Sequence, residues 1–219
     1  MAMPIRPLLL GHRGARGEKS VPENTLASFD LALARDCDGF EFDVRLSADR
    51  QPVICHDATS GRFIIEQCTA RSLALPLLSE VIERYRNSAF LDIELKVIGL
   101  ESIVMDLLRL YPPERGYVVS SFIPEVLSTL REMSASIPLG LICDSQNQFH
   151  VWPGSAADYA ILHRKLAQRE VITQIKGEGK KILVWTVNSP REIQKFKEYE
   201  VDGIISDYPE RLGMVKRAV

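Results

Sequence analysis

Short apolar runs with the length of buried strands alternate with helix-like segments along nearly the whole chain. The strands are expected at Pro7–His12, Gly39–Leu46, Phe90–Lys96, Gly116–Phe122, Ile137–Cys143, Tyr159–His163, Lys181–Val187 and Gly203–Ser206. The segments between them carry apolar residues at helical spacing. Such an alternation predicts a parallel α/β fold, because a crossover helix joins each strand to the next. No linker or internal repeat divides the sequence, so we expect a single domain over residues 1–219.

Local signals place the helices. Asn24 is expected to be the N-cap of the first helix, and Pro124 suits the first turn of a later one. Further helices are expected at Leu78–Arg86, at Leu100–Leu110, up to about Ile175 before Gly177 and Gly179, and at Pro190–Tyr199. Pro52–His56 is expected to be an extension beside the mouth of such a fold, Thr59–Ala74 shows no clear pattern, and Asp144–Ser155 is expected to be irregular.

Charge and hydropathy patterning exclude several classes of function. The formal net charge of −2 provides no global basic field that would attract nucleic acid or an anionic membrane. No apolar segment approaches the ~20 residues of a membrane span, and the N-terminal apolar run is too short for a signal peptide. The cysteines, which are Cys37, Cys55, Cys68 and Cys143, form no C-x-x-C pair. We therefore expect a cytoplasmic protein with reduced thiols and without stable membrane insertion.

Three carboxylates lie inside the strand segments. Glu41 and Asp43 are two residues apart, so their side chains leave the strand on the same face. Two buried carboxylates on one face repel each other unless a proton or a cation lies between them. Glu94 shares a face with Lys96 on the next strand. An oxygen-rich set of this kind suits Mg²⁺ or Ca²⁺.

Two of the four histidines flank these carboxylates. His12 ends the first strand and is followed by Arg13, and His56 follows the short run from Pro52. Cations neutralise phosphoryl oxygens, and imidazoles move protons near neutral pH. A divalent ion, basic side chains and two histidines together describe a site for a phosphate ester.

The motifs that carry these residues resemble the glycerophosphodiester phosphodiesterase family, whose members are barrel enzymes related to phosphatidylinositol-specific phospholipases C. The matching motifs, in the family's order, are His12-Arg13-Gly14, Pro22-Glu23-Asn24-Thr25, Glu41-Phe42-Asp43-Val44, His56-Asp57, Ile93-Glu94-Leu95-Lys96, Val184-Trp185-Thr186-Val187-Asn188 and Ile205-Ser206-Asp207. The resemblance implies a (β/α)₈ TIM barrel, in which catalytic groups lie at the C-terminal ends of the strands. It also implies cleavage of a small-molecule glycerophosphodiester to sn-glycerol 3-phosphate and an alcohol.

The same resemblance suggests a role for each candidate residue. Glu41, Asp43 and Glu94 are expected to bind a divalent metal ion, either Mg²⁺ or Ca²⁺. His12 and His56 are expected to be the acid–base pair, with the acid and the base not distinguished. Substrate contacts are expected from Arg13, Lys96 and Trp185, the first two to the phosphate.

Simpler structural roles compete with some of these assignments. Lys96 could instead be an ion-pair partner of Glu94 or Asp43. Asp57 could orient His56 or merely end its strand. Asn188 and Asp207 also fall at or near strand ends that would meet at the barrel mouth, but they could be turn and cap residues.

One departure from the family bears on the substrate. Many members carry an insertion between the His-Asp motif and the strand that bears the third carboxylate, whereas only 38 positions separate His56 from Glu94 here. A shortened insertion after the second strand leaves the pocket more open and the glycerol group less firmly indicated than phosphodiester cleavage. Cleavage of lysophospholipids, a cyclising phosphodiesterase reaction and a non-catalytic barrel that binds phosphorylated ligands are the alternatives.

Overall fold

Eight parallel strands form a closed barrel in the computed structural model, which describes residues 6–217. In spatial order the strands are β1 (Leu8–Gly11), β2 (Gly39–Leu46), β6 (Phe90–Leu95), β7 (Tyr117–Ser121), β8 (Leu139–Cys143), β9 (Tyr159–His163), β10 (Lys181–Trp185) and β11 (Gly203–Ser206). The barrel closes because β1 pairs with β11 on one side and with β2 on the other. The predicted TIM-barrel fold is confirmed.

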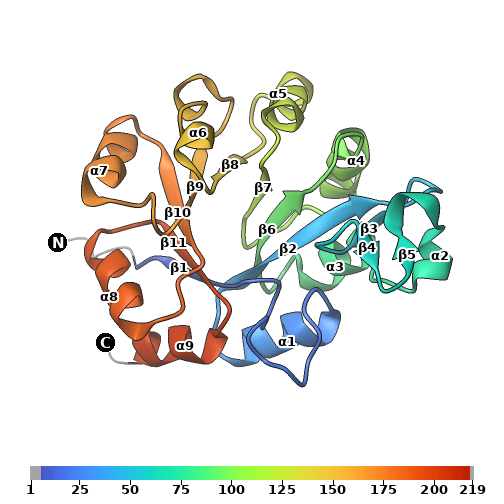
Figure 1. Cartoon of the computed structure of the whole chain (residues 1–219), viewed down its shortest axis with the longest axis horizontal. Helices are drawn as coiled ribbons and strands as arrows, with labels where there is room; N and C mark the ends of the chain where they lie inside the picture. The colour runs from blue at the N-terminus through green and yellow to red at the C-terminus, as the bar shows by residue number, and fades with distance from the viewer. Residues whose placement is uncertain (1–5, 218–219) are drawn as a thin grey trace.

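The helices surround the strands, as Figure 1 shows. They are α1 (Leu26–Ala34), α3 (Leu78–Tyr85), α4 (Glu101–Leu110), α5 (Pro124–Met133), α7 (Arg169–Gly177), α8 (Pro190–Glu198) and α9 (Pro209–Arg217). The link from β8 to β9 holds only the short helix α6 (Gln146–Phe149) and a 3₁₀ turn at Trp152–Gly154, in the region expected to be irregular. None of the helices within residues 6–217 is both long enough and apolar enough to cross a bilayer.

Two apolar layers hold the barrel together. Alternate strand residues fill the interior, including Leu10, Val118 and Ile161. The opposite faces of the strands pack against the helices in a larger core, where the Phe29 and Phe40 rings stack with centroids 4.3 Å apart. The strand ends that bear polar residues are therefore held by packing on both faces of the sheet.

The first helix begins one residue later than expected. Its N-cap is Thr25, whose side chain accepts a hydrogen bond from the Ser28 N–H, so the assignment of Asn24 was wrong. Asn24 has a left-handed φ of 57°, and its side-chain amide donates to Asp43 at 2.8 Å. Asn24 thus holds a strand carboxylate instead of capping the helix. The expected end of α7 near Ile175 also moves, to Gly177.

A small layer of secondary structure lies beside the barrel after β2. Strand β3 (Pro52–Ile54), in the segment expected to be an extension, pairs antiparallel with β2, which the sequence did not indicate. It is followed by the hairpin β4 (Thr59–Ser60) and β5 (Phe63–Ile64) and by helix α2 (Ala70–Leu73). These elements pack on Val53 and Ile65. They are too short to produce a hydrophobic period, which explains why Thr59–Ala74 showed no pattern.

Candidate active site

The three carboxylates converge at the end of the barrel where β2 and β6 run side by side. Asp43 and Glu94 are register partners on these strands, and Glu41 lies one alternate position earlier on β2. One oxygen from each side chain lies within 4.8 Å of the other two. All three side chains are buried. Strand pairing therefore builds an oxygen-only cluster from residues that are far apart in the sequence.

Burial and mutual repulsion perturb these acids. Burial, followed by the charges of Asp43 and Glu94, raises the pKa of Glu41 well above its usual range. Burial, followed by the charge of Asp43, raises the pKa of Glu94 to about 7 against the opposing charge of Lys96. Within residues 6–217, Glu41 Oε1 has no hydrogen-bond partner. A buried, unpartnered carboxylate oxygen in an oxygen-only cluster fits the donor set of a hard divalent cation.

His12 points at this cluster from the end of β1. Its Nε2 lies 3.7 Å from Glu41 Oε2, and its Nδ1 lies 2.7 Å from Asp207 Oδ1. Asp207 follows β11, and Asn188 donates a hydrogen bond of 2.7 Å to its other oxygen. Burial raises the pKa of Asp207, but the hydrogen bonds from His12 and Asn188 outweigh it and lower the pKa to about 2. Asp207 is thus an ionised carboxylate that orients the imidazole.

The sequence did not indicate this contact. Asp207 was placed at a strand end near the barrel mouth, but only a turn or cap role was considered for it, and 195 positions separate it from His12. The signal that could have identified it is its position directly after the last barrel strand, because β1 and β11 must be neighbours in a closed barrel.

His56 lies on the loop after β3, at the edge of the same pocket. Its Nδ1 is 2.7 Å from Asp57 Oδ1, so both histidines of the site direct Nδ1 at a carboxylate. The two pairs differ in environment, since the Asp57 side chain is 74% exposed and that of Asp207 only 13%. The expectation that Asp57 orients His56 matches this contact.

Arg13 and Lys96 are ion-paired to the acids of the site. Lys96 Nζ lies 2.6 Å from Glu94 and 3.2 Å from Asp43. Arg13 Nε lies 3.2 Å from Asp43, and its NH1 donates to Glu23 at 2.7 Å. The simpler ion-pair role considered for Lys96 therefore describes its contacts in this structure. Both cations also line the pocket, where a phosphate could take a hydrogen bond from either.

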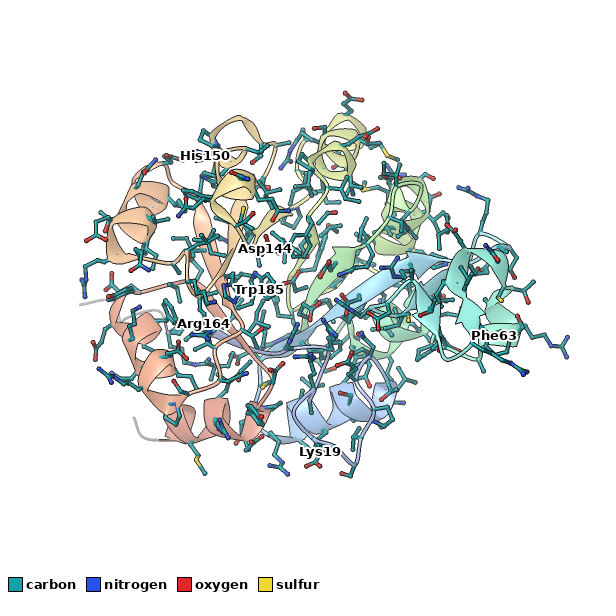
Figure 2. The ribbon with its side chains drawn as sticks, in the orientation of Figure 1. Lys19, Phe63, Asp144, His150, Arg164 and Trp185 are labelled. Atoms are coloured by element: carbon teal, nitrogen blue, oxygen red, sulfur yellow. The ribbon has the colours of Figure 1, made fainter. Side chains whose placement is uncertain are left out.

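The pocket is lined by both polar and apolar side chains. The polar lining includes His12, Glu41, His56, Glu94 and the two cations, and the ring of Trp185, at the end of β10, lies 6.4 Å from that of His12. Figure 2 places Trp185 near the centre of the ring of helices. All the sequence-predicted site residues except Asp43 line the pocket, and Asp43 lies directly behind it, fully buried.

Several known proteins are similar to this chain in sequence and in fold. The sequence profile of the glycerophosphoryl diester phosphodiesterase family matches residues 12–104 and 76–211. The protein YhdW of Bacillus subtilis (strain 168) is 33% identical over 92% of this chain and 95% of its own length. A glycerophosphodiester phosphodiesterase of Caldanaerobacter subterraneus subsp. tengcongensis is 28% identical over 95% of this chain and 97% of its own.

A solved structure extends the comparison to the fold. A phosphodiesterase from Oleispira antarctica, in complex with the product sn-glycerol-3-phosphate, superposes with a TM-score of 0.83 at 25% identity, with 97% of each chain covered. Family profile, relatives and fold agree over nearly the whole chain. The chain therefore belongs to the glycerophosphodiester phosphodiesterase family of hydrolases.

Proposed function

We propose that the protein is a metal-dependent hydrolase that cleaves glycerophosphodiesters to sn-glycerol 3-phosphate and an alcohol by acid–base catalysis with two histidines. One observation carries this proposal: two carboxylate-oriented imidazoles line the pocket of a buried three-carboxylate cluster. The product bound to the Oleispira antarctica phosphodiesterase supports the substrate class.

Glu41, Asp43 and Glu94 would hold the metal ion, either Mg²⁺ or Ca²⁺. The buried Glu41 Oε1 without a hydrogen-bond partner, and the absence of nitrogen or sulfur from the cluster, support a hard cation. When bound, the ion would withdraw negative charge from the phosphoryl oxygens.

The two histidines would exchange protons with the attacking oxygen and the leaving alcohol. With a proton on Nδ1 held by Asp207, His12 keeps Nε2 free to accept or return a proton. His56 is arranged in the same way by Asp57. Because the two imidazoles enter the pocket from different segments, the end of β1 and the loop after β3, one could act on the entering oxygen while the other acts on the departing one.

Arg13 and Lys96 would hold the phosphate in place between these groups. Both cations already lie against the acidic cluster, so a phosphate near the metal would meet them at hydrogen-bond range. Trp185, whose ring lies 6.4 Å from that of His12, would border the substrate in the same pocket.

The test measures the release of glycerol 3-phosphate from glycerophosphocholine with a coupled dehydrogenase assay. The assay is run with Mg²⁺, with Ca²⁺ and with EDTA. Activity should require a metal and fall by roughly 10²- to 10⁴-fold in His12→Ala and in His56→Ala. His150→Ala is the matched control, because His150 is exposed at the end of α6 and outside the pocket. Full activity of either active-site variant would refute the two-histidine scheme.

The products also separate the alternative chemistries. A cyclic phosphate would indicate attack by the neighbouring glycerol hydroxyl in place of water. Lysophosphatidate released from a lysophospholipid, without glycerol 3-phosphate from glycerophosphocholine, would instead favour a lipid substrate.

A further inference from the structure

The two histidines of the site are anchored to the barrel in different ways. The backbone N–H of His12 donates to the Ser206 carbonyl at 2.8 Å, so His12 continues the ladder between β1 and β11. His56 lies on the loop after β3, and Asp57, which orients its ring, is the next residue of the same loop. A contact between adjacent residues turns the imidazole within the loop but does not fix the loop against the barrel. The placement of His56 relative to the carboxylate cluster therefore depends on other contacts.

The side chain of Arg45 connects this loop to the barrel. Its Nε donates a 2.8 Å hydrogen bond to the carbonyl oxygen of His56. One residue earlier, the Cys55 N–H donates to the Asp43 carbonyl at 3.0 Å and extends the pairing of β3 with β2. Within residues 6–217, the hydrogen bond from Arg45 is the only one to the backbone of His56. Arg45 thus holds the loop at the histidine itself, where the strand pairing has ended.

Arg45 belongs to the strand that carries two of the proposed metal ligands. Side chains alternate along β2, so Arg45 leaves the strand on the same face as Asp43 and Glu41. The intervening Val44 is fully buried in the core between the strands and the helices. Strands β2 and β3 run side by side (Figure 1). Because one strand bears both the carboxylates and the anchor of His56, this anchor sets the imidazole directly relative to the metal cluster.

The hydrogen bond of Arg45 bears on catalysis more than its charge does. Arg13 and Lys96 already supply positive charge to the pocket, and Arg45 is not among the described residues that line it. The pKa of Asp57 is lowered chiefly by the hydrogen bond from His56, and the charge of Arg45 contributes little. Solvent screens that charge, because Asp57 is exposed. The directed contact from Nε–H to the carbonyl oxygen is what remains for Arg45 to supply.

We propose that Arg45 is a positioning residue for His56, whose carbonyl it holds so that the imidazole stays in place beside the carboxylate cluster. This inference rests on the proposed function, because it gives Arg45 a part in the acid–base step. In this role Arg45 touches neither the substrate nor the metal. Its loss should lower kcat, because a misplaced imidazole transfers protons less well, and should leave KM and metal binding nearly unchanged.

Two substitutions separate the hydrogen bond from the charge. Arg45→Gln keeps an N–H donor at the same number of bonds from Cα as the native Nε but has no charge, and Arg45→Met has a similar shape without a donor. We expect kcat for glycerophosphocholine to fall by roughly 10- to 100-fold in Arg45→Met but by less than about threefold in Arg45→Gln, with KM within about twofold in both. Thermal melting verifies that each variant is folded.

Arg50 provides a matched control on the turn between β2 and β3. It is exposed, and its NH2 donates to another backbone carbonyl, that of Gly99, at 3.3 Å. Arg50→Met should keep the wild-type kcat. A double-mutant cycle then shows whether Arg45 acts through His56. In a His56→Ala background, Arg45→Met should cause no further loss of kcat, because no imidazole is left to place.

Three results would each overturn the positioning role. They are wild-type kcat in Arg45→Met, an equal loss in Arg45→Met and Arg45→Gln, and a further loss when Arg45→Met is added to His56→Ala. If His56→Ala keeps full activity, or if no glycerophosphodiester is cleaved, the proposed function fails, and NMR decides the anchoring. The backbone order parameter of His56 should be about 0.85 in the wild type and Arg45→Gln, and less than about 0.6 in Arg45→Met. An unchanged value in Arg45→Met would overturn the anchoring as well.

Discussion

Replacing Asp207 with asparagine should nearly abolish catalysis while the barrel stays folded. In the native site His12 Nδ1 and Arg16 NH1 both donate to Asp207 Oδ1, and Asn188 donates to Oδ2. Every neighbour of the carboxylate is a donor, so one donor must face the amide NH₂ in either orientation of the asparagine. If that donor is His12, the neutral imidazole carries its proton on Nε2 instead of Nδ1. The Nε2 atom, which faces Glu41, can then no longer accept a proton.

The size of the effect follows from the charge that is lost. An ionised carboxylate about 4 Å from an imidazolium stabilises it by about 4 kcal/mol at an effective dielectric constant near 20. At 1.36 kcal/mol per tenfold, kcat should fall by roughly a thousandfold. Asp57→Asn, which removes the exposed partner of His56, should cost less than about tenfold, because solvent screens that pair.

The assay is the pH profile of kcat for the wild type and the two asparagine variants, with thermal melting to verify folding. Loss of Asp207 should move the limb that reports His12 to lower pH, since the carboxylate stabilises the protonated ring. A purely structural role would lower stability without moving that limb. A decrease of less than tenfold in kcat with an unmoved limb would refute the view that Asp207 acts through His12.

Three further expectations follow from the same structure. Ca²⁺ at about 100 times its Kd should raise the melting temperature of the wild type by roughly 5–10 °C but hardly that of Glu41→Gln, as scanning calorimetry would show, and an equal rise in both would contradict the metal assignment. The pKa of Asp207, lowered to about 2, implies a stabilisation that is complete above about pH 4 and lost as the pH falls toward 2. Urea unfolding should therefore find Asp207→Asn more destabilising at pH 6 than at pH 3, and the reverse order would contradict this sign. Phe29→Ala should cost about 3–5 kcal/mol of unfolding free energy, because the buried ring stacks on Phe40, and a cost under about 1 kcal/mol would show that the core refills the cavity.

The parts of this site that follow from local spacing could be predicted from the sequence. Two-residue alternation on one strand suffices to bring Glu41 and Asp43 to one face. The alternation of strand-like and helix-like runs suffices for a parallel α/β fold, and the family resemblance implied its closure into a barrel. These inferences need no knowledge of which strands are neighbours.

The parts that depend on long-range contacts could not be predicted. Asn24 is a residue type that favours N-cap positions, yet its left-handed backbone directs its side-chain amide to Asp43. Thr25 is the N-cap instead. From the sequence, Asp207 could be interpreted as a turn residue. Closure of the barrel brings it into contact with His12. In both cases a residue type that suits local turns was used for a tertiary contact that only the folded barrel creates.

Closure of the barrel by β1 and β11 also determines when in its synthesis the chain can become active. Glu41, Asp43 and Glu94 lie on strands made early, so they can assemble while translation is still under way. The imidazole of His12, made earlier still, acquires its carboxylate only when β11 docks against β1. A nascent chain that ends before β11 would carry every proposed metal ligand and both histidines, yet His12 would remain unoriented. Under the proposed two-histidine mechanism, turnover would thus await one of the last segments of the described chain to leave the ribosome.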